Sequence, residues 1–176
     1  MRHLYLTGYR GCGKTTIAER LSGLLGLPWC DTDAMVEASA GTTIANIFAN
    51  SGEEVFRDLE SAAIRSLSCA TTPSIVALGG GAILRPQNLS LLKASGWVAW
   101  LQASPQTLAN RISGDQSTAS RRPALSQLGV LAEIEAVLAK RLPLYREAAD
   151  QAFDTEANGI DSVVEQIAEA YQRIAD

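Results

Sequence analysis

The sequence lacks most of the features that mark secreted and membrane-bound proteins. Its 176 residues include three cysteines (Cys12, Cys30 and Cys69), which are odd in number, widely spaced and without a Cys-x-x-Cys pair. This pattern argues against a disulfide framework and against a zinc site, and it indicates free thiols in a reducing compartment. No apolar run approaches the roughly 18 residues of a membrane span, and no basic segment leads into a secretion signal. We therefore expect a cytoplasmic protein that does not bind a membrane.

An excess of positive charge is missing as well. The chain carries 15 lysines and arginines against 19 acidic residues, for a formal net charge of −4, and it has no block of like charges. We therefore expect no nucleic-acid partner. The single histidine, His3, offers no Ser–His–Asp arrangement. The composition, 47% hydrophobic and 19% charged without an internal repeat, predicts one globular domain, and we expect it to be a monomer.

The strongest positive feature is the segment from Gly8 to Thr16, which reads GYRGCGKTT and matches the phosphate-loop pattern G-x-x-x-x-G-K-[ST]. An apolar, strand-forming stretch (3–7) precedes it, and a stretch with helical spacing (16–25) follows it. Backbone N–H groups converge on an anion in such a loop, and Lys14 reaches the β- and γ-phosphates. The sequence therefore predicts a nucleoside triphosphate site. Its residues are Gly11, Cys12, Gly13, Lys14, Thr15 and Thr16.

Two acidic residues end the next predicted strand, at 28–33. Asp31 and Asp33 stand two residues apart, so in an extended chain their side chains point to the same side. Ligands bind at the carboxyl ends of strands in open α/β sheets, which favours a site close to the phosphate loop. Asp33 could equally cap the helix that follows, and the two roles are compatible.

Two further segments suggest a second binding site. A helix is predicted to begin at Ser51–Glu54 through a capping box, and on it Arg57 and Glu60 are three residues apart. This pair is either a surface ion pair of little consequence or an arginine oriented by Glu60 to bind a carboxylate. Three glycines (79–81) follow a predicted strand at 74–78, where backbone can approach a ligand closely.

The rest of the chain continues the alternation of strands and helices. We expect helices after Pro86 and from Pro105, with a strand at 97–103 between them, then two helices, 130–149 and 160–174. We expect the first of these two to be broken near Pro143, with a short strand around Phe153 between the two. The polar segment 114–123 ends in two arginines and suggests a lid over phosphates. The alternation predicts an α/β fold, a doubly wound parallel sheet with right-handed crossovers.

Taken together, these motifs resemble shikimate kinase. GTPase motifs are absent, and the proline that adenylate kinases usually carry in the phosphate loop is replaced by the Tyr9–Arg10 region. The resemblance covers most of the chain, and its more specific parts lie outside the phosphate loop. The segments that carry it are GYRGCGKTT (8–16), DTD (31–33), FRDLE (56–60), GGG (79–81), RP (122–123) and RLPLY (141–145).

The resemblance implies a three-layer sandwich of the P-loop kinase type with a five-stranded parallel sheet. Its single domain, 1–176, would have a core formed by 1–32 and 60–113. The substrate-binding region would span about 33–59, and a mobile lid would span about 113–128.

The resemblance also implies the reaction, transfer of the γ-phosphoryl of ATP to the 3-hydroxyl of shikimate with Mg²⁺, in chorismate biosynthesis. Asp33 would orient or deprotonate the hydroxyl, while Arg57, steadied by Glu60, and Arg141 would bind the carboxylate. The remaining implied contacts with shikimate come from Gly79, Gly80, Gly81, Phe48 and Phe56.

On the nucleotide side, the resemblance implies that Thr15 and Asp31 hold Mg²⁺, Asp31 through water. Arg111 would lie in the adenine-stacking region, and Arg122 would reach the transferring phosphoryl together with Lys14. Three departures from the family pattern concern Ala77, where members often have serine, the additional Arg121 in the lid, and the loop 156–159, which lacks basic residues. A gluconate-type sugar-acid kinase and a non-catalytic ATP-binding regulator remain as alternatives.

Overall fold

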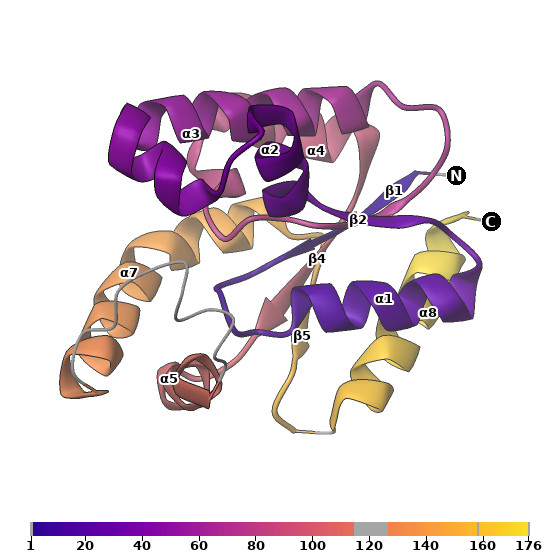
Figure 1. Cartoon of the computed structure of the whole chain (residues 1–176). Coiled ribbons are helices and arrows are strands. Elements are labelled where there is room, and N and C mark those ends of the chain that lie inside the picture. The colour runs from indigo at the N-terminus through magenta and orange to yellow at the C-terminus, as the bar shows by residue number, and fades with distance from the viewer. Residues whose placement is uncertain (1, 115–126, 158, 176) are drawn as a thin grey trace.

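The computed structural model of the chain describes residues 2–114, 127–157 and 159–175 (Figure 1). Five strands form one sheet in the order β2-β3-β1-β4-β5, and every neighbouring pair is parallel. The strands are β1 (His3–Thr7), β2 (Trp29–Asp31), β3 (Ile75–Ala77), β4 (Gly96–Gln102) and β5 (Gln151–Asp154). The helices are α1 (Lys14–Leu25), α2 (Thr32–Ala40), α3 (Ile44–Ser68), the 3₁₀ turn η1 (Ala82–Leu84), α4 (Pro86–Ser95), α5 (Pro105–Gly114), α7 (Gln127–Ala148) and α8 (Gly159–Ala175).

Alternate residues of β1 pack on opposite faces of the sheet. Leu4 and Leu6 belong to a large buried cluster that includes residues of α1 and α8. Tyr5 belongs to a second cluster with residues of α3 and α4. Figure 1 shows the same arrangement, with α1 and α8 on one side of the strands and α3 and α4 on the other. A parallel sheet buried on both faces is the expected result of right-handed crossovers. The predicted three-layer α/β sandwich with a five-stranded parallel sheet is confirmed.

The second strand is shorter than predicted. It ends at Asp31, and Asp33 lies in the first turn of α2 rather than in an extended chain. The reason is local, because the Asp31 carboxylate accepts a hydrogen bond from the Asp33 backbone N–H at 2.9 Å and caps the helix. The capping residue is therefore Asp31, and the expectation that Asp33 extends the strand is wrong. Trp29 of this edge strand is 37% exposed.

The helix predicted to begin at Ser51 is part of a longer one. Thr43 caps α3 by accepting a hydrogen bond from the Asn46 backbone N–H at 3.3 Å, so the helix already starts at Ile44. Gly52 interrupts it with φ 83° and ψ 174°, a conformation that glycine adopts easily. The helix start predicted at Ser51 is therefore a kink at Gly52 within α3.

The predicted break at Pro143 is wrong, because α7 continues through it to Ala148. A proline inside a helix costs about 3 kcal/mol. Two fully buried residues beyond the proline, Tyr145 and Ala148, pack with Ile83 and Trp100 and hold this part of the helix on the protein. Burial of that apolar surface offsets the proline penalty.

The segment between β2 and the kink of α3 has a small core of its own. Val36 of α2 packs with Ile44, Ile47 and Phe56 of α3, in a cluster separate from those on the sheet faces. The predicted lid, about 113–128, begins within α5 and ends within α7, and its residues 115–126, including Arg121 and Arg122, lie outside the described residues. Within the described parts of the chain, no helix is long and apolar enough to cross a membrane.

Candidate active site

The strand order brings the predicted motifs to one edge of the sheet. β2, β3 and β1 are adjacent, and at their carboxyl ends stand Asp31, the triple glycine 79–81 and the phosphate loop. This edge is where open α/β sheets bind ligands. Residues about 70 positions apart in the chain therefore meet at one site.

The phosphate loop depends on glycine at three positions. Gly8, Gly11 and Gly13 have φ values of 142°, 81° and 93°, which residues with a Cβ rarely adopt. Gly13 stands at the N-cap of α1 without a side-chain hydrogen bond to the helix. The first N–H groups of α1 therefore face the loop without a capping side chain, which is the arrangement that binds phosphate.

Lys14 is folded onto its own loop. Its Nζ donates hydrogen bonds to the carbonyl oxygens of Gly8 at 2.9 Å and Tyr9 at 3.0 Å, and it lies 3.7 Å from the Sγ of Cys12. Cys12 is buried, and its backbone N–H donates to the Tyr9 carbonyl at 3.3 Å. The Cys12 thiol therefore packs inside the loop. Thr16 lies in the first turn of α1 with an exposed side chain.

The two predicted metal ligands touch each other. Thr15 Oγ1 donates a hydrogen bond to Asp31 Oδ2 at 3.0 Å. Their oxygen atoms suit Mg²⁺, which takes few protein ligands and completes its shell with water and phosphate. Among the residues described, no group of three or more histidine, cysteine or acidic side chains could hold a metal. The pair therefore fits an ion that is shared with a phosphate chain.

Arg57 and Glu60 form a buried ion pair. Arg57 Nη1 lies 2.8 Å from Glu60 Oε2, and Nη2 lies 3.0 Å from Glu53 Oε1. The side chains of Arg57 and Glu60 are only 8% and 1% exposed, so this is not the surface pair left open by the sequence. Burial lowers the pKa of the Arg57 guanidinium. The hydrogen bonds and negative charges of Glu60 and Glu53 have the larger combined effect, so the net pKa is raised. Burial raises the pKa of Glu60, and Arg57 acts against this rise.

The triple glycine lies against these charged groups. A Cβ built on Gly79 would lie 2.5 Å from Asp33 Oδ1 and 2.9 Å from Glu60 Oε1. A Cβ on Gly81 would lie 2.7 Å from the Cζ of Arg57. Neither position has room for a side chain, so the glycines let the turn pack directly on the acid and the arginine. The structure thus brings Asp33, Arg57 and Glu60 together around one turn.

Arg141 approaches the same turn from α7. Its Nη1 donates a hydrogen bond to the carbonyl oxygen of Gly80 at 3.0 Å. The carboxylate of Glu60 is close enough for Arg141 to lower its pKa, although burial keeps the net shift upward. Two arginines, Arg57 and Arg141, therefore both lie against the triple glycine, and guanidinium groups of this kind can bind a carboxylate.

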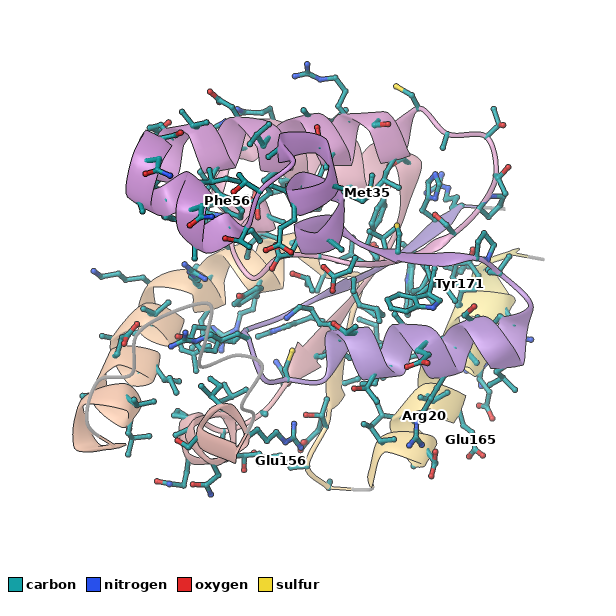
Figure 2. The ribbon with its side chains drawn as sticks, viewed as in Figure 1. Arg20, Met35, Phe56, Glu156, Glu165 and Tyr171 are labelled. Carbon is teal, nitrogen blue, oxygen red and sulfur yellow. The ribbon has the colours of Figure 1, made fainter. Side chains whose placement is uncertain are left out.

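Two phenylalanines, predicted to line the apolar side of this site, pack against each other next to Arg57. The rings of Phe48 and Phe56 have centroids 4.9 Å apart, and both lie in or against the small core of α2 and α3. Figure 2 shows Phe56 on α3 near this core. The guanidinium carbon of Arg57 lies 5.0 Å from the centre of the Phe56 ring. The phenylalanine therefore also supports the arginine.

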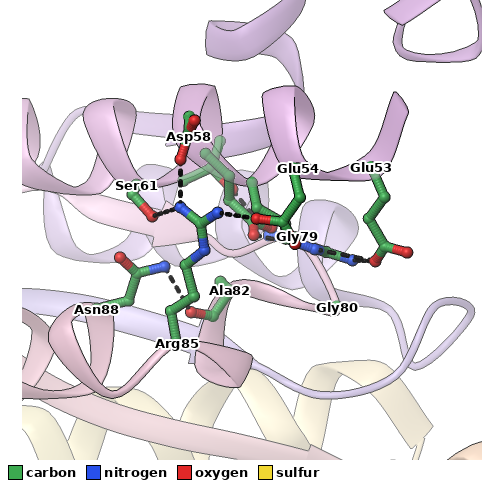
Figure 3. A network of polar contacts seen from close by, with 12 residues as sticks. Glu53, Glu54, Asp58, Ser61, Gly79, Gly80, Ala82, Arg85 and Asn88 are labelled. Atoms are coloured by element: carbon green, nitrogen blue, oxygen red, sulfur yellow. Dashed lines mark hydrogen bonds and ion pairs between the residues drawn. The ribbon is translucent and has the colours of Figure 1, made fainter. Parts of the chain in front are cut away.

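Arg85 connects the turn that follows the triple glycine to α3 through side-chain hydrogen bonds. It donates to Asp58 Oδ1 at 2.7 Å, to Glu54 Oε2 at 2.9 Å and to Ser61 Oγ at 3.4 Å (Figure 3). Arg57 lies on the same part of α3. Arg85, at the start of α4, therefore connects α4 to the segment of α3 that carries Arg57. The sequence predicted a helix after Pro86 but gave Arg85 no role.

Arg111, predicted to lie in the adenine-stacking region, links α5 to the loop after β5. It donates to Thr155 Oγ1 at 3.0 Å and to the Thr155 carbonyl at 2.9 Å, and it lies 3.4 Å from the Gly11 carbonyl. Glu156 of that loop accepts hydrogen bonds from the backbone and side chain of Ser104, each at 2.7 Å, and it lies beside α5 in Figure 2. Hydrogen bonds from Thr107 and Ser104 lower the pKa of Glu156.

An apolar cavity of about 300 Å³ lies beside the phosphate loop. Tyr9 and Cys12 of the loop line it together with side chains of β4, α5 and α7, including Trp100. Asp33, Arg57 and Arg141 do not line this cavity. It is therefore distinct from the charged site around the triple glycine.

Sequence reasoning missed Thr32, the middle residue of the DTD motif. Its fully buried hydroxyl accepts a hydrogen bond from the Gly79 backbone N–H at 2.8 Å and lies 3.4 Å from the Ala77 carbonyl. Thr32 thus ties the start of α2 to the triple glycine across 47 positions of sequence. A residue between two acids in a predicted strand gives no signal of such a contact.

We expect Thr32→Val to lower the free energy of unfolding by about 1–3 kcal/mol, because the buried Gly79 N–H loses its acceptor. Urea denaturation followed by circular dichroism measures the change. Thr7→Val is the matched control, since the Thr7 hydroxyl is also buried but has no hydrogen-bond partner within the described part of the chain. Equal effects of the two substitutions would contradict the role assigned to Thr32.

Comparison with known proteins gives one family. The family model described as shikimate kinase matches residues 10–172. The chain is 46% identical over 169 residues to a shikimate kinase of Rhodopirellula baltica, covering 96% of this chain and 90% of the relative. It is 40% identical over 170 residues to a shikimate kinase of Symbiobacterium thermophilum, covering 97% and 96% of the two chains.

Solved structures agree. The structure of a shikimate kinase from Acinetobacter baumannii in complex with shikimate superposes with a TM-score of 0.89 at 30% identity, covering 99% of this chain and 94% of the other. A gluconokinase from Sinorhizobium meliloti superposes with a TM-score of 0.64 at 17% identity, covering 99% and 93%. The second likeness shows a shared fold only.

Proposed function

Since the chain belongs to the shikimate kinase family, we propose that it transfers the γ-phosphoryl group of ATP to the 3-hydroxyl of shikimate, giving shikimate 3-phosphate and ADP in chorismate biosynthesis. The observation that carries the proposal is the meeting of Asp33, Arg57 and Arg141 at the triple glycine beside the phosphate loop. An acid and two arginines are what a hydroxylated carboxylic acid requires of its site.

Arg57 and Arg141 bind the shikimate carboxylate. Both guanidinium groups lie at the triple glycine, and each can offer a planar pair of N–H donors. Glu60 and Glu53 keep Arg57 charged and in place through their hydrogen bonds. The ring of shikimate then lies against the backbone of the glycines, with Phe48 and Phe56 on its apolar side.

Asp33 receives the reacting hydroxyl. It sits in the first turn of α2 against Gly79, next to the strand end that carries Asp31. A carboxylate there orients the 3-hydroxyl toward the γ-phosphate or accepts its proton as the oxygen attacks. Positioning is most of the catalysis in phosphoryl transfer, because the transition state needs little covalent help.

The phosphate loop and its neighbours bind ATP. The N–H groups of the loop and α1 bind the phosphates, and Lys14 exchanges the carbonyls of Gly8 and Tyr9 for phosphate oxygens. Bound Mg²⁺ neutralises charge on the β- and γ-phosphates, and Thr15 and Asp31 would hold it, Asp31 through water. Arg111 borders the adenine side through its bonds to Thr155.

Several narrower statements belong to this proposal. Arg122 contacts the transferring phosphoryl group as part of a lid at about 113–128. The core of the domain comprises 1–32 and 60–113, and the region 33–59 binds the substrate. The protein acts as a monomer. It works in the cytoplasm, where ATP is available and its three cysteines, which are free thiols, stay reduced.

The alternative kinases are less well supported. The gluconokinase shares the fold at 17% identity, which carries no argument about the acceptor. A non-catalytic regulator has no need for an acid at the acceptor position, whereas Asp33 is present and packed against Gly79.

The release of ADP from Mg·ATP tests the proposal. We expect a large rate increase on adding shikimate and none on adding gluconate, with the acceptor-free rate as baseline. Stimulation by gluconate alone would overturn the substrate assignment. Slow release insensitive to both would leave ATP binding in place and overturn the claim of catalysis.

A further inference from the structure

The carbonyl oxygen of Gly80 accepts two hydrogen bonds from α7. One comes from Arg141 Nη1 at 3.0 Å, and the other comes from the hydroxyl of Tyr145 at 2.9 Å. The two donors stand one helical turn apart, so they reach the same acceptor from one face of α7. The position of this carbonyl therefore decides where the guanidinium of Arg141 lies.

A side chain at Gly80 would be in ordinary contact with the phosphate loop and with Arg141. A Cβ built on it would lie 3.6 Å from the Gly8 carbonyl oxygen, 3.7 Å from the Arg10 backbone nitrogen and 3.8 Å from Arg141 Nη1. The turn thus touches the backbone of the phosphate loop and the arginine at once. A shift of the Gly80 carbonyl would change the spacing between these two parts of the site.

Tyr145 is well fixed. It is fully buried, and its ring stacks on Trp100 of β4 with centroids 5.6 Å apart and planes 17° apart. Burial raises the pKa of Tyr145 to about 12, so the hydroxyl remains a donor at neutral pH. The stacking on Trp100 therefore fixes the Tyr145 hydroxyl relative to β4, and the hydroxyl stays protonated while it donates to the Gly80 carbonyl.

We propose that Tyr145 is a positioning residue for acceptor binding: by holding the Gly80 carbonyl against β4, it orients the Arg141 guanidinium toward the substrate carboxylate. The inference rests on the proposed function, because it assigns the carboxylate to Arg141. Tyr145 itself touches no reacting atom. Its hydroxyl also interacts with the Arg141 side chain, so its effect reaches the arginine both directly and through the backbone oxygen that they share.

Tyr145→Phe tests the proposal, because it removes the hydroxyl and keeps the ring on Trp100. We expect the KM for shikimate to rise about three- to tenfold, as for the loss of one buried hydrogen bond. The KM for ATP and the kcat should stay within about twofold, because the phosphate loop keeps its own contacts. An unchanged KM for shikimate would overturn the proposal.

Tyr5→Phe is the matched control. Tyr5 is also fully buried, and its hydroxyl bonds the Ser95 hydroxyl at 2.7 Å, in the cluster on the face of α3 and α4. We expect its KM for shikimate to match that of the unaltered protein, whatever its melting temperature. If both substitutions change kcat and both KM values alike, Tyr145 is only a structural residue and the proposal is wrong.

A double-substitution cycle with Arg141→Lys measures whether Tyr145 acts on shikimate binding through Arg141. Lysine keeps the charge but lacks the planar fork, so Tyr145→Phe should add less than about twofold in that background. Full additivity of the two effects would overturn the coupling between Tyr145 and Arg141. If the unaltered protein does not phosphorylate shikimate at all, the proposed function fails first, and this outcome is distinct from the others.

Discussion

Asp33→Asn is expected to lower kcat about 10²–10⁴-fold, the usual contribution of a positioned acid–base group. Asparagine has nearly the same shape, so it preserves the packing of residue 33 against Gly79 but cannot accept the proton of the attacking hydroxyl. The affinity for Mg·ATP should remain unchanged, because Lys14, Thr15 and the loop backbone form the nucleotide site. Stopped-flow ADP release measures kcat, and calorimetry measures ATP binding.

The control for Asp33→Asn is Asp161→Asn. Asp161 also supplies a carboxylate to the first turn of a helix, α8, where it pairs with Arg20. Its removal loses only the interaction with the helix dipole and an exposed ion pair, each of which contributes about 0.3–1 kcal/mol to the free energy of unfolding. The substitution should leave kcat unchanged. A kcat for Asp33→Asn within threefold of this control would show that Asp33 is not the acceptor's partner.

Arg57→Ala is expected to raise the KM for shikimate about 10²-fold, because hydrogen bonds to a charged group contribute about 1.5–3 kcal/mol. It should also destabilise the fold by about 3–5 kcal/mol, since Glu60 is 1% exposed and loses the cation that offsets its burial. Steady-state kinetics with varied shikimate and thermal denaturation measure the two effects.

The two effects of Arg57→Ala can be separated. In Arg57→Ala with Glu60→Gln the uncompensated buried charge is gone, so the melting temperature should recover in part while the KM for shikimate stays high. Arg20→Ala is the control, because Arg20 forms an exposed pair with Asp161. Recovery of shikimate affinity in the double variant would mean that Arg57 serves the fold alone.

The phosphate loop could be predicted from sequence because its information is local. Nine consecutive residues, Gly8 to Thr16, contain the glycines that need positive φ and the lysine that folds back onto the loop. The strand before the loop and the helix after it follow from apolar periodicity over short stretches. The alternation of strands and helices, and with it a parallel doubly wound sheet, followed from the same local patterns, whereas the number of strands came from the family resemblance.

Contacts made over long distances in the chain could not be predicted. The spacing of Arg57 and Glu60 suggested a pair, but only the packing of α3 on the triple glycine shows that it is buried. Thr32 bonds Gly79 and Tyr145 bonds Gly80 across 47 and 65 positions, and neither residue type marks such a partner in sequence. These contacts depend on tertiary packing.

Errors in helix boundaries arose where a local signal competed with another local signal or with tertiary packing. Asp31 and Asp33 are both good caps, and the bond from the Asp33 N–H decided in favour of Asp31. At Pro143 the intrinsic penalty predicted a break, whereas burial of Tyr145 keeps α7 continuous. Local propensity gave the wrong answer where tertiary burial contributed more free energy.

The position of the new phosphate ester on shikimate shows whether this protein phosphorylates the 3-hydroxyl. We would incubate the protein with Mg·ATP and shikimate and record ³¹P and proton NMR spectra of the mixture. We expect ADP and a single phosphomonoester whose phosphorus couples to the proton on carbon 3 of shikimate. ADP accompanied only by inorganic phosphate, or an ester on another hydroxyl, would contradict this expectation.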